Sequence, residues 1–145
     1  MNATEQIRVR GELEIEVRRK GVLIERWAGA NVVTEAGKDR IAERAGGLGE
    51  PISRIGIGED GTAATPQDTA LVNSYAQDVD SVGAVAGQRV RFAFDIGAGQ
   101  GTGTVIREFG LLTADGVMCA RRVRTNPITK DADTTVSGQW TLILS

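Results

Sequence analysis

Apolar and polar residues alternate with a period of two along much of the chain, which is the pattern of half-buried β-strands. In residues 12–18 (ELEIEVR), three apolar residues alternate with charged ones, so one face of this strand is expected to be buried. Residues 22–27 (VLIERW) return after a tight turn and complete a predicted hairpin. Gly21 suits this turn because glycine adopts positive φ without steric cost.

The same alternation predicts four strands in the second half of the chain. They cover residues 88–96, 105–113, 117–123 and 134–144. Asp115-Gly116 separates the second from the third, and this dipeptide is a strong hairpin signal. Trp140 lies on the apolar face of the last strand, so we expect it in the core and its strand paired inside the sheet.

Two short helices are predicted between the strands. Thr34 can cap a helix over residues 35–45, which ends at two consecutive glycines, although Gly37 is a poor helix former. Thr65, followed by proline at the first helical position, starts a second and shorter helix. About seven strands with one or two short helices predict an all-β fold. We expect a mainly antiparallel β-sandwich, jelly-roll-like, with a distorted barrel as the alternative.

The composition is that of a globular protein. The chain has 145 residues, of which 41% are hydrophobic and 25% charged, so a single β-sandwich domain over residues 1–145 is expected. Residues 1–10 are a candidate extended N-terminal arm. They lack the apolar core of a signal peptide, and no stretch approaches the ~18 apolar residues of a membrane span.

The residue types that are missing exclude most catalytic chemistry. Without histidine, the chain cannot use an imidazole as a base, a metal ligand or a proton shuttle. Its one cysteine, Cys119, cannot form an internal disulfide and is expected to be a buried hydrophobe. The net charge of −2, with no basic block, gives little support for nucleic-acid binding. We therefore predict no catalytic, cofactor-binding or metal-ligating residue, no cofactor and no small-molecule substrate.

Several motifs that can carry chemistry have simpler structural explanations. The segment Gly56–Gly61 fits GxGxxG, but a loop follows it where dinucleotide binding needs a helix. The glycine-rich residues 97–103 lack the Lys-Ser/Thr of a phosphate loop and are expected to join two strands. Two Asp-x-Asp pairs lack the later ligands of a calcium loop and are expected in solvated turns: Asp78/Asp80 and Asp131/Asp133.

Three arginines, Arg121, Arg122 and Arg124, cluster on one predicted strand. Arginine is favoured in protein–protein contacts, so these residues are the candidate protein interface, together with the two chain ends. The alternative is a set of solvated or edge-strand charges that oppose mispairing.

Five segments, taken together and in this order, form a recognisable pattern of turns and core residues. They are GVLIERWAGANVVTEAGKDRIA, ISRIGIGEDGTAATPQDTAL, VIREFGLLTADGVMCARRV, NPITKDAD and the terminal QWTLIL. This pattern resembles small virion structural proteins of tailed bacteriophages, of the kind found in tail, tail-fibre and baseplate modules. The resemblance covers roughly residues 11–145 and contains no catalytic motif.

The resemblance implies a non-enzymatic adaptor of the tail, baseplate or tail fibre that is made in the host bacterial cytoplasm and ends up in the virion. Its expected partners are copies of itself, with a trimer favoured, and other virion proteins, rather than nucleic acid or membrane. A capsid-decorating cement protein is the close alternative. A carbohydrate- or receptor-binding module is a distant one, because it needs exposed aromatic residues and the candidates are few: Trp27, Tyr75 and Trp140.

Overall fold

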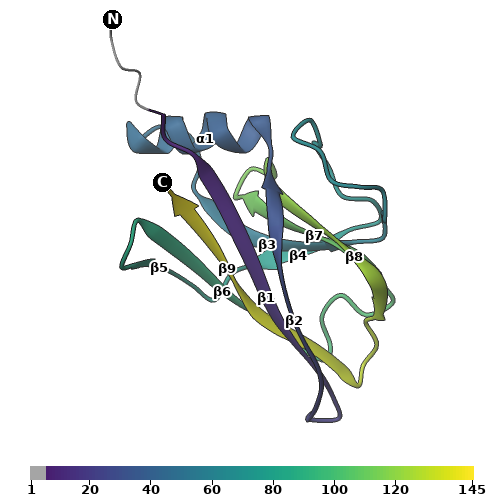
Figure 1. The fold of residues 1–145 in the computed structure, drawn as a ribbon. Coiled ribbons are helices and arrows are strands. Elements are labelled where there is room, and N and C mark those ends of the chain that lie inside the picture. Colours follow the sequence, from purple (N-terminus) through teal and green to yellow (C-terminus); the bar gives the residue numbers. More distant parts are fainter. Residues whose placement is uncertain (1–5) are drawn as a thin grey trace, which may run out of the picture.

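A computed structural model of the protein describes residues 6–145, which form nine strands and one helix (Figure 1). The elements are β1 (Val9–Arg19), β2 (Val22–Val33), α1 (Glu35–Ala45), β3 (Ile52–Gly58), β4 (Tyr75–Asp78), β5 (Ser81–Val85), β6 (Arg89–Ile96), β7 (Val105–Thr113), β8 (Met118–Thr129) and β9 (Thr134–Leu144). The predicted all-β fold with antiparallel strands is confirmed. Among residues 6–145 no helix is long and apolar enough to cross a membrane.

The strands form one curled sheet in the order β4-β3-β7-β8-β2-β1-β9-β6-β5. Strand β2 connects its two halves, because it pairs with β1 over most of its length and with β8 through Val32 and Val33. The end strands β4 and β5 are joined by Val79 and Asp80, whose N–H groups donate to the carbonyls of Ser53 and Ala93. The two halves are thus linked on both sides and face each other across the core.

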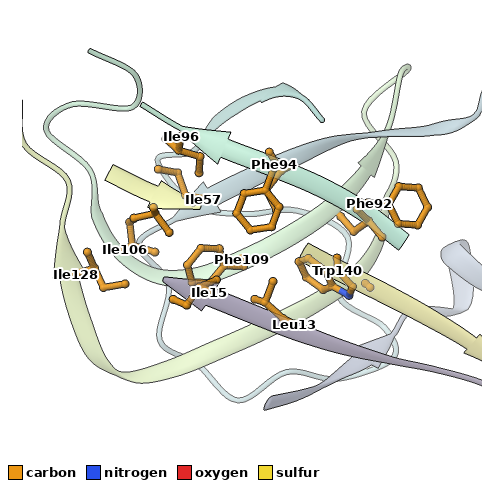
Figure 2. Packing of buried hydrophobic residues seen from close by; sticks show 14 of the residues in the cluster. Leu13, Ile15, Ile57, Phe92, Phe94, Ile96, Ile106, Phe109, Ile128 and Trp140 are labelled. Atoms are coloured by element: carbon orange, nitrogen blue, oxygen red, sulfur yellow. The ribbon is translucent and has the colours of Figure 1, made fainter. Parts of the chain in front are cut away.

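The core fills the space between the two halves of the sheet (Figure 2). Trp140 is fully buried there, as the alternation predicts, and its indole N–H donates to Asn31 Oδ1 at 2.9 Å. The inward-facing side chains come from strands of both halves: Leu13, Ile15, Ile57, Phe92, Phe94, Ile96, Ile106, Phe109 and Ile128 are among them. The last strand pairs with β1 on one side and β6 on the other, so its predicted place inside the sheet is confirmed.

Helix α1 packs against β8 at one end of the sheet. Its predicted cap is confirmed, because Thr34 Oγ1 accepts from the N–H of Gly37 at 2.9 Å and donates to the carbonyl of Met118 at 2.7 Å. Gly37, the weak point of the helix prediction, is buried against β8. A Cβ at this position would lie 2.2 Å from the carbonyl oxygen of Cys119, so the close approach of helix and strand requires glycine.

Gly37→Ala is expected to destabilise the fold although alanine is the better helix former by about 1 kcal/mol. The added methyl group meets backbone of β8, and overpacking of this kind costs about 1–3 kcal/mol. Denaturant melts measure the difference, with Gly99→Ala as the control because a Cβ there meets nothing within 4 Å. A Gly37→Ala protein as stable as the wild type would contradict the packing.

Two turns are confirmed by their backbone angles. Lys20 and Gly21 both have positive φ in the β1–β2 hairpin, and Gly116 has φ 88° between β7 and β8.

The predicted second helix at Thr65 is wrong. Thr65 donates both its N–H and its hydroxyl to the carboxylate of Asp68, and residues 66–67 form a turn that does not continue as a helix.

Strands β4 and β5 were not among the predicted strands, which raises the number from about seven to nine. Of the candidate N-terminal arm, residues 1–5 lie outside the described part of the chain. Arg8 exchanges backbone hydrogen bonds with Ser145, and the last two arm residues, Val9 and Arg10, belong to β1.

Candidate functional site

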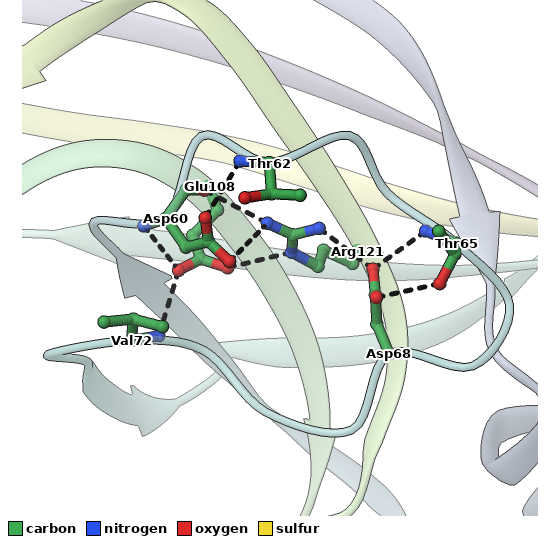
Figure 3. Close-up of polar contacts among 7 residues, drawn as sticks. All are labelled: Asp60, Thr62, Thr65, Asp68, Val72, Glu108 and Arg121. Atoms are coloured by element: carbon green, nitrogen blue, oxygen red, sulfur yellow. Dashed lines mark hydrogen bonds and ion pairs between the residues drawn. The ribbon is translucent and has the colours of Figure 1, made fainter.

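The densest group of polar side chains is a buried network centred on Glu108 of β7 and Arg121 of β8 (Figure 3). Glu108 has no exposed surface and Arg121 is 2% exposed. Arg121 Nε donates to Glu108 Oε1 at 2.8 Å. A buried pair of this kind is tolerated only when the remaining donors and acceptors of both groups also find partners.

The second oxygen of Glu108 holds both ends of the loop over residues 59–74. Oε2 accepts the backbone N–H of Asp60 at 2.8 Å and that of Val72 at 3.0 Å. Gly58 makes room for this carboxylate, because a Cβ at that position would lie 2.5 Å from Oε2. Gly58, part of the GxGxxG match, therefore serves the approach of Glu108 in this fold.

The guanidinium of Arg121 holds the middle of the same loop. Its Nη1 lies 2.9 Å from Asp68 Oδ2, and its Nη2 donates to the carbonyl of Asp60 at 3.1 Å. The carboxylate of Asp60 adds a longer ion pair at 3.6 Å. Asp68 also accepts from the N–H and hydroxyl of Thr65. Four charged side chains, two on the strands and two on the loop, thus fix a loop that contains no regular secondary structure.

Burial, hydrogen bonds and charge act against each other on the pKa of Asp68. Burial raises this pKa, but the hydrogen bonds from Thr65 and the Arg121 guanidinium outweigh burial and hold it below its usual value. The hydrogen bonds from Thr62 lower the pKa of Asp60. The N–H of Val105 and the amide of Asn73 lower the pKa of Glu59. The loop is therefore held by carboxylates in their ionised form.

The carboxylates at the centre of this network have hydrogen-bond partners within the chain. Both oxygens of Glu108 and both oxygens of Asp68 already accept hydrogen bonds from the chain itself. In the part of the chain that the structure describes, no group of three or more Cys, Asp or Glu residues is arranged to hold a metal ion. The arrangement positions the 59–74 loop on β7 and β8.

Acid is expected to destabilise this loop. A carboxylate whose pKa is lowered by folding stabilises the native state above its unfolded pKa of about 4, and the contribution is lost as the pH falls through the folded pKa. The free energy of unfolding should change little between pH 7 and 5 and decline below about pH 4. Melts at pH 7, 5 and 3 test this, together with hydrogen exchange at the amides of Thr65 and Val105, which donate to Asp68 and Glu59. Equal stability and protection at pH 7 and pH 3 would contradict it.

The candidate interface arginines do lie on one strand, β8: Arg121, Arg122 and Arg124. Their guanidinium groups, however, bind groups of the same chain. Arg124 is 5% exposed and pairs with both carboxylate oxygens of Glu25 at 3.0 Å. Arg122 is half-buried and donates to the carbonyl of Ala30. Both guanidinium groups stack on Trp27, at 4.9 and 5.2 Å from the ring centre. The alternative interpretation, a set of solvated charges, does not fit Arg121 and Arg124, which are buried. That the three arginines contact a partner protein stays a prediction.

Cys119 is buried as predicted, and Asp131 and Asp133 lie at the predicted turn, but Asp78 belongs to strand β4 and not to a turn. Cys119 is 1% exposed, and burial raises the pKa of its thiol to about 11, so the reactive thiolate is scarce at neutral pH. Asp131 accepts from Arg19, Thr134 and the N–H of Asp133, which lowers its pKa to about 2 and closes the turn before β9. Asp78 is exposed at the end of β4.

Lys130 is a buried charge that the sequence reasoning did not single out. It has no exposed surface, and its Nζ donates to the carbonyls of Ala98 and Asp131 at 3.3 and 3.1 Å. Its backbone also pairs with Gly103 and Thr104, so it holds the glycine-rich loop between β6 and β7. Glu108 was missed as well. The signal for Glu108 is a single carboxylate inside the mostly apolar strand VIREFGLL, between Arg107 and Phe109.

The surface formed by residues 6–145 includes two hollows beside the strands. The larger, about 610 Å³, lies over β1, β2 and β9 and is lined by Glu14, Arg26, Trp27 and Gln139 among others. The smaller, about 260 Å³, lies between helix α1 and the end of the sheet that carries β5.

Comparisons of the chain with protein families, with curated proteins and with solved structures found no match.

Proposed function

We propose that the chain is a non-enzymatic structural protein of a bacteriophage virion, an adaptor of the tail, baseplate or tail fibre that assembles with copies of itself. The resemblance to such proteins consists of separate segments, and the polar network draws on three places in them. Asp68, Glu108 and Arg121 come from GTAATPQDTAL, VIREFGLL and CARRV and meet in one buried cluster. The most distinctive polar residues of the pattern thus serve the architecture, as expected of a building block.

The observation that carries self-assembly is an exposed apolar tip on the β1–β2 hairpin. Val22, Leu23 and Ile24 are 64%, 39% and 58% exposed and are consecutive in the sequence. A run of three exposed apolar residues is unfavourable in a monomer and typical of an interaction site. A cyclic assembly with one such tip from each copy at its axis would cover all of them.

Contacts with neighbouring strands hold the base of this hairpin, the part of β2 that carries residues 25–27. Trp27 lies under two guanidinium groups, Arg124 pairs with Glu25, and Arg26 pairs with Glu16 across the strands at 3.2 Å. Two of the three arginines predicted at the interface, Arg122 and Arg124, therefore support the strand that carries the tip. A rigid base lowers the conformational entropy that an assembly would otherwise lose.

The two alternative functions, capsid decoration and carbohydrate binding, need different structural features. A capsid-decorating protein needs the same kind of small β-fold, and only its place in the particle separates it from an adaptor. A carbohydrate-binding module needs an exposed aromatic platform. Trp140 is fully buried, Trp27 is stacked against two arginines, and the Tyr75 hydroxyl donates to Gln77, so these aromatics favour the structural role.

Quantitative mass spectrometry of purified phage particles tests this role. Particles are collected from cells that produce the chain, and its copy number is measured against the major capsid protein. Dozens of copies per particle are expected for a tail or baseplate adaptor. Hundreds of copies would replace the adaptor with the capsid-decorating alternative, and a chain that is absent from washed particles would contradict a virion role.

A further inference from the structure

Strand β5, at one end of the sheet, is an uncharged edge. Its sequence is SVGAV, it pairs with β6 alone, and Ser81 to Ala84 are all exposed, with Val82 at 52%. Exposed edges in native proteins are normally protected by charged residues, proline, a bulge or a covering segment, because an open edge recruits further strands. Residues 81–85 carry no charge and no proline.

The register shows which backbone groups this edge presents. Leu144 donates its N–H to the carbonyl of Gln88, which fixes the alternation along β6: Arg89, Arg91 and Ala93 direct their backbone groups toward β5. Their partners on β5 are Val85, Gly83 and Ser81. The intervening residues Val82 and Ala84 therefore direct their N–H and C=O groups away from the sheet, free to pair with an added strand.

An apolar crevice opens beside this edge. Its volume is about 260 Å³, and its lining includes Ile41 and Arg44 of α1, Val82 of β5, Phe92 of β6 and Leu142 of β9. Val82 faces inward, opposite Phe92. Every second side chain of a strand added to β5 would point to the same side as Val82 and could enter this crevice.

Two arginines without a carboxylate partner lie on the other face of the same strands. Within residues 6–145, neither Arg89 nor Arg91 forms an ion pair, and Arg91 Nε is buried without a hydrogen-bond partner. Arg91 lies opposite Gly83, where a Cβ would meet nothing within 4 Å. An added strand would run about 10 Å from β6, two strand spacings away, which Arg and Glu side chains together can span.

We propose that β5 is a docking edge for an extended segment of another protein in which acidic and apolar residues alternate. The backbone of the segment pairs with Val82 and Ala84. Its apolar side chains enter the crevice between β5 and α1, and its carboxylates cross Gly83 to meet Arg91 and Arg89. Strand addition of this type takes affinity from main-chain hydrogen bonds and specificity from alternate side chains.

Charge argues against a second copy of this chain at the same edge. Pairing β5 with β5 of another copy would bring Arg89 and Arg91 of both copies toward one interface, with no carboxylate from SVGAV to oppose them. The inference goes beyond the virion role and does not need it, because an acidic strand can be tested on the purified chain alone.

The test uses three fluorescein-labelled peptides and the full chain, with binding followed by fluorescence anisotropy. One peptide alternates Glu and Val over eight residues, one has the same composition in blocks of two, and one has Lys in place of Glu. Ala84→Pro removes an outward N–H without removing a bond to β6, and Ala84→Val keeps that N–H as the matched control. Val82→Lys, at the mouth of the crevice, is a second variant should the proline disturb folding.

The alternating acidic peptide is expected to bind the wild type at least about tenfold more tightly than either other peptide. Ala84→Pro and Val82→Lys should each weaken it by about tenfold or more, and Ala84→Val by less than about twofold. No binding of this peptide, equal binding of the Lys peptide, or binding unchanged in both disruptive variants would overturn the proposal. Light scattering that shows Ala84→Pro reducing the number of copies would assign the edge to a second copy instead.

Discussion

Glu108→Gln is expected to lower the free energy of unfolding by about 3–5 kcal/mol, because it breaks the fully buried ion pair of Arg121 and leaves this charge with the partly exposed carboxylates of Asp60 and Asp68. The amide also fails for a geometric reason. Glu108 Oε1 accepts from Arg121 and Oε2 accepts from Asp60 and Val72, so both ends face N–H donors. Whichever way the glutamine is turned, its own NH₂ meets one of these donors.

Chemical denaturation and amide hydrogen exchange measure this effect together. Protection of the Asp60 and Val72 amides should fall first, since these amides lose their acceptor. Glu12→Gln is the matched control, a strand carboxylate on the exposed face of β1, and it should change stability by less than about 0.5 kcal/mol. A loss below about 1 kcal/mol for Glu108→Gln, with protection unchanged, would show that the loop is held by other contacts.

Trp140→Ala is expected to cost about 3–5 kcal/mol, because Trp140 is the largest fully buried side chain of the core and its removal leaves a cavity. Trp140→Phe separates packing from hydrogen bonding. It keeps much of the ring volume but removes the N–H that Asn31 Oδ1 accepts, and Asn31 Nδ2 already has no partner. We expect this variant to lose about 1–3 kcal/mol, the cost of a buried acceptor left unpaired.

Guanidinium melts of both variants, followed by near-ultraviolet circular dichroism, distinguish these contributions. The order of stability should be wild type, then Trp140→Phe, then Trp140→Ala. A Trp140→Ala protein within about 1 kcal/mol of the wild type would place the side chain outside the core.

The sequence predicts the fold well where alternation is long and fails where it is short. Segments 88–96, 105–113 and 134–144 coincide with β6, β7 and β9 to within one residue, because each has at least eight residues with an apolar face. The four residues of β4 and the five of β5 lack that alternation. Their pairing depends on β3 and β6, which no local pattern can show.

The site was less predictable than the fold. The arginine cluster was visible on the chain, but the partners of Arg121 are set by tertiary structure. Glu108 is 13 positions away, Asp68 53 and Asp60 61. The predicted contact between Thr65 and the first-turn carboxylate Asp68 exists, although no helix follows it. Asp68 instead binds Arg121, a tertiary contact that the local sequence cannot show.

The proposed role depends on self-association, and size-exclusion chromatography with light scattering tests this most directly. We predict a single species of three or more copies. Ile24→Lys on the hairpin tip should convert it to a monomer, whereas Leu48→Lys, an equally exposed apolar position elsewhere, should leave it intact. A wild-type chain that stays monomeric at every concentration, or an assembly that Ile24→Lys does not affect, would contradict assembly through the tip.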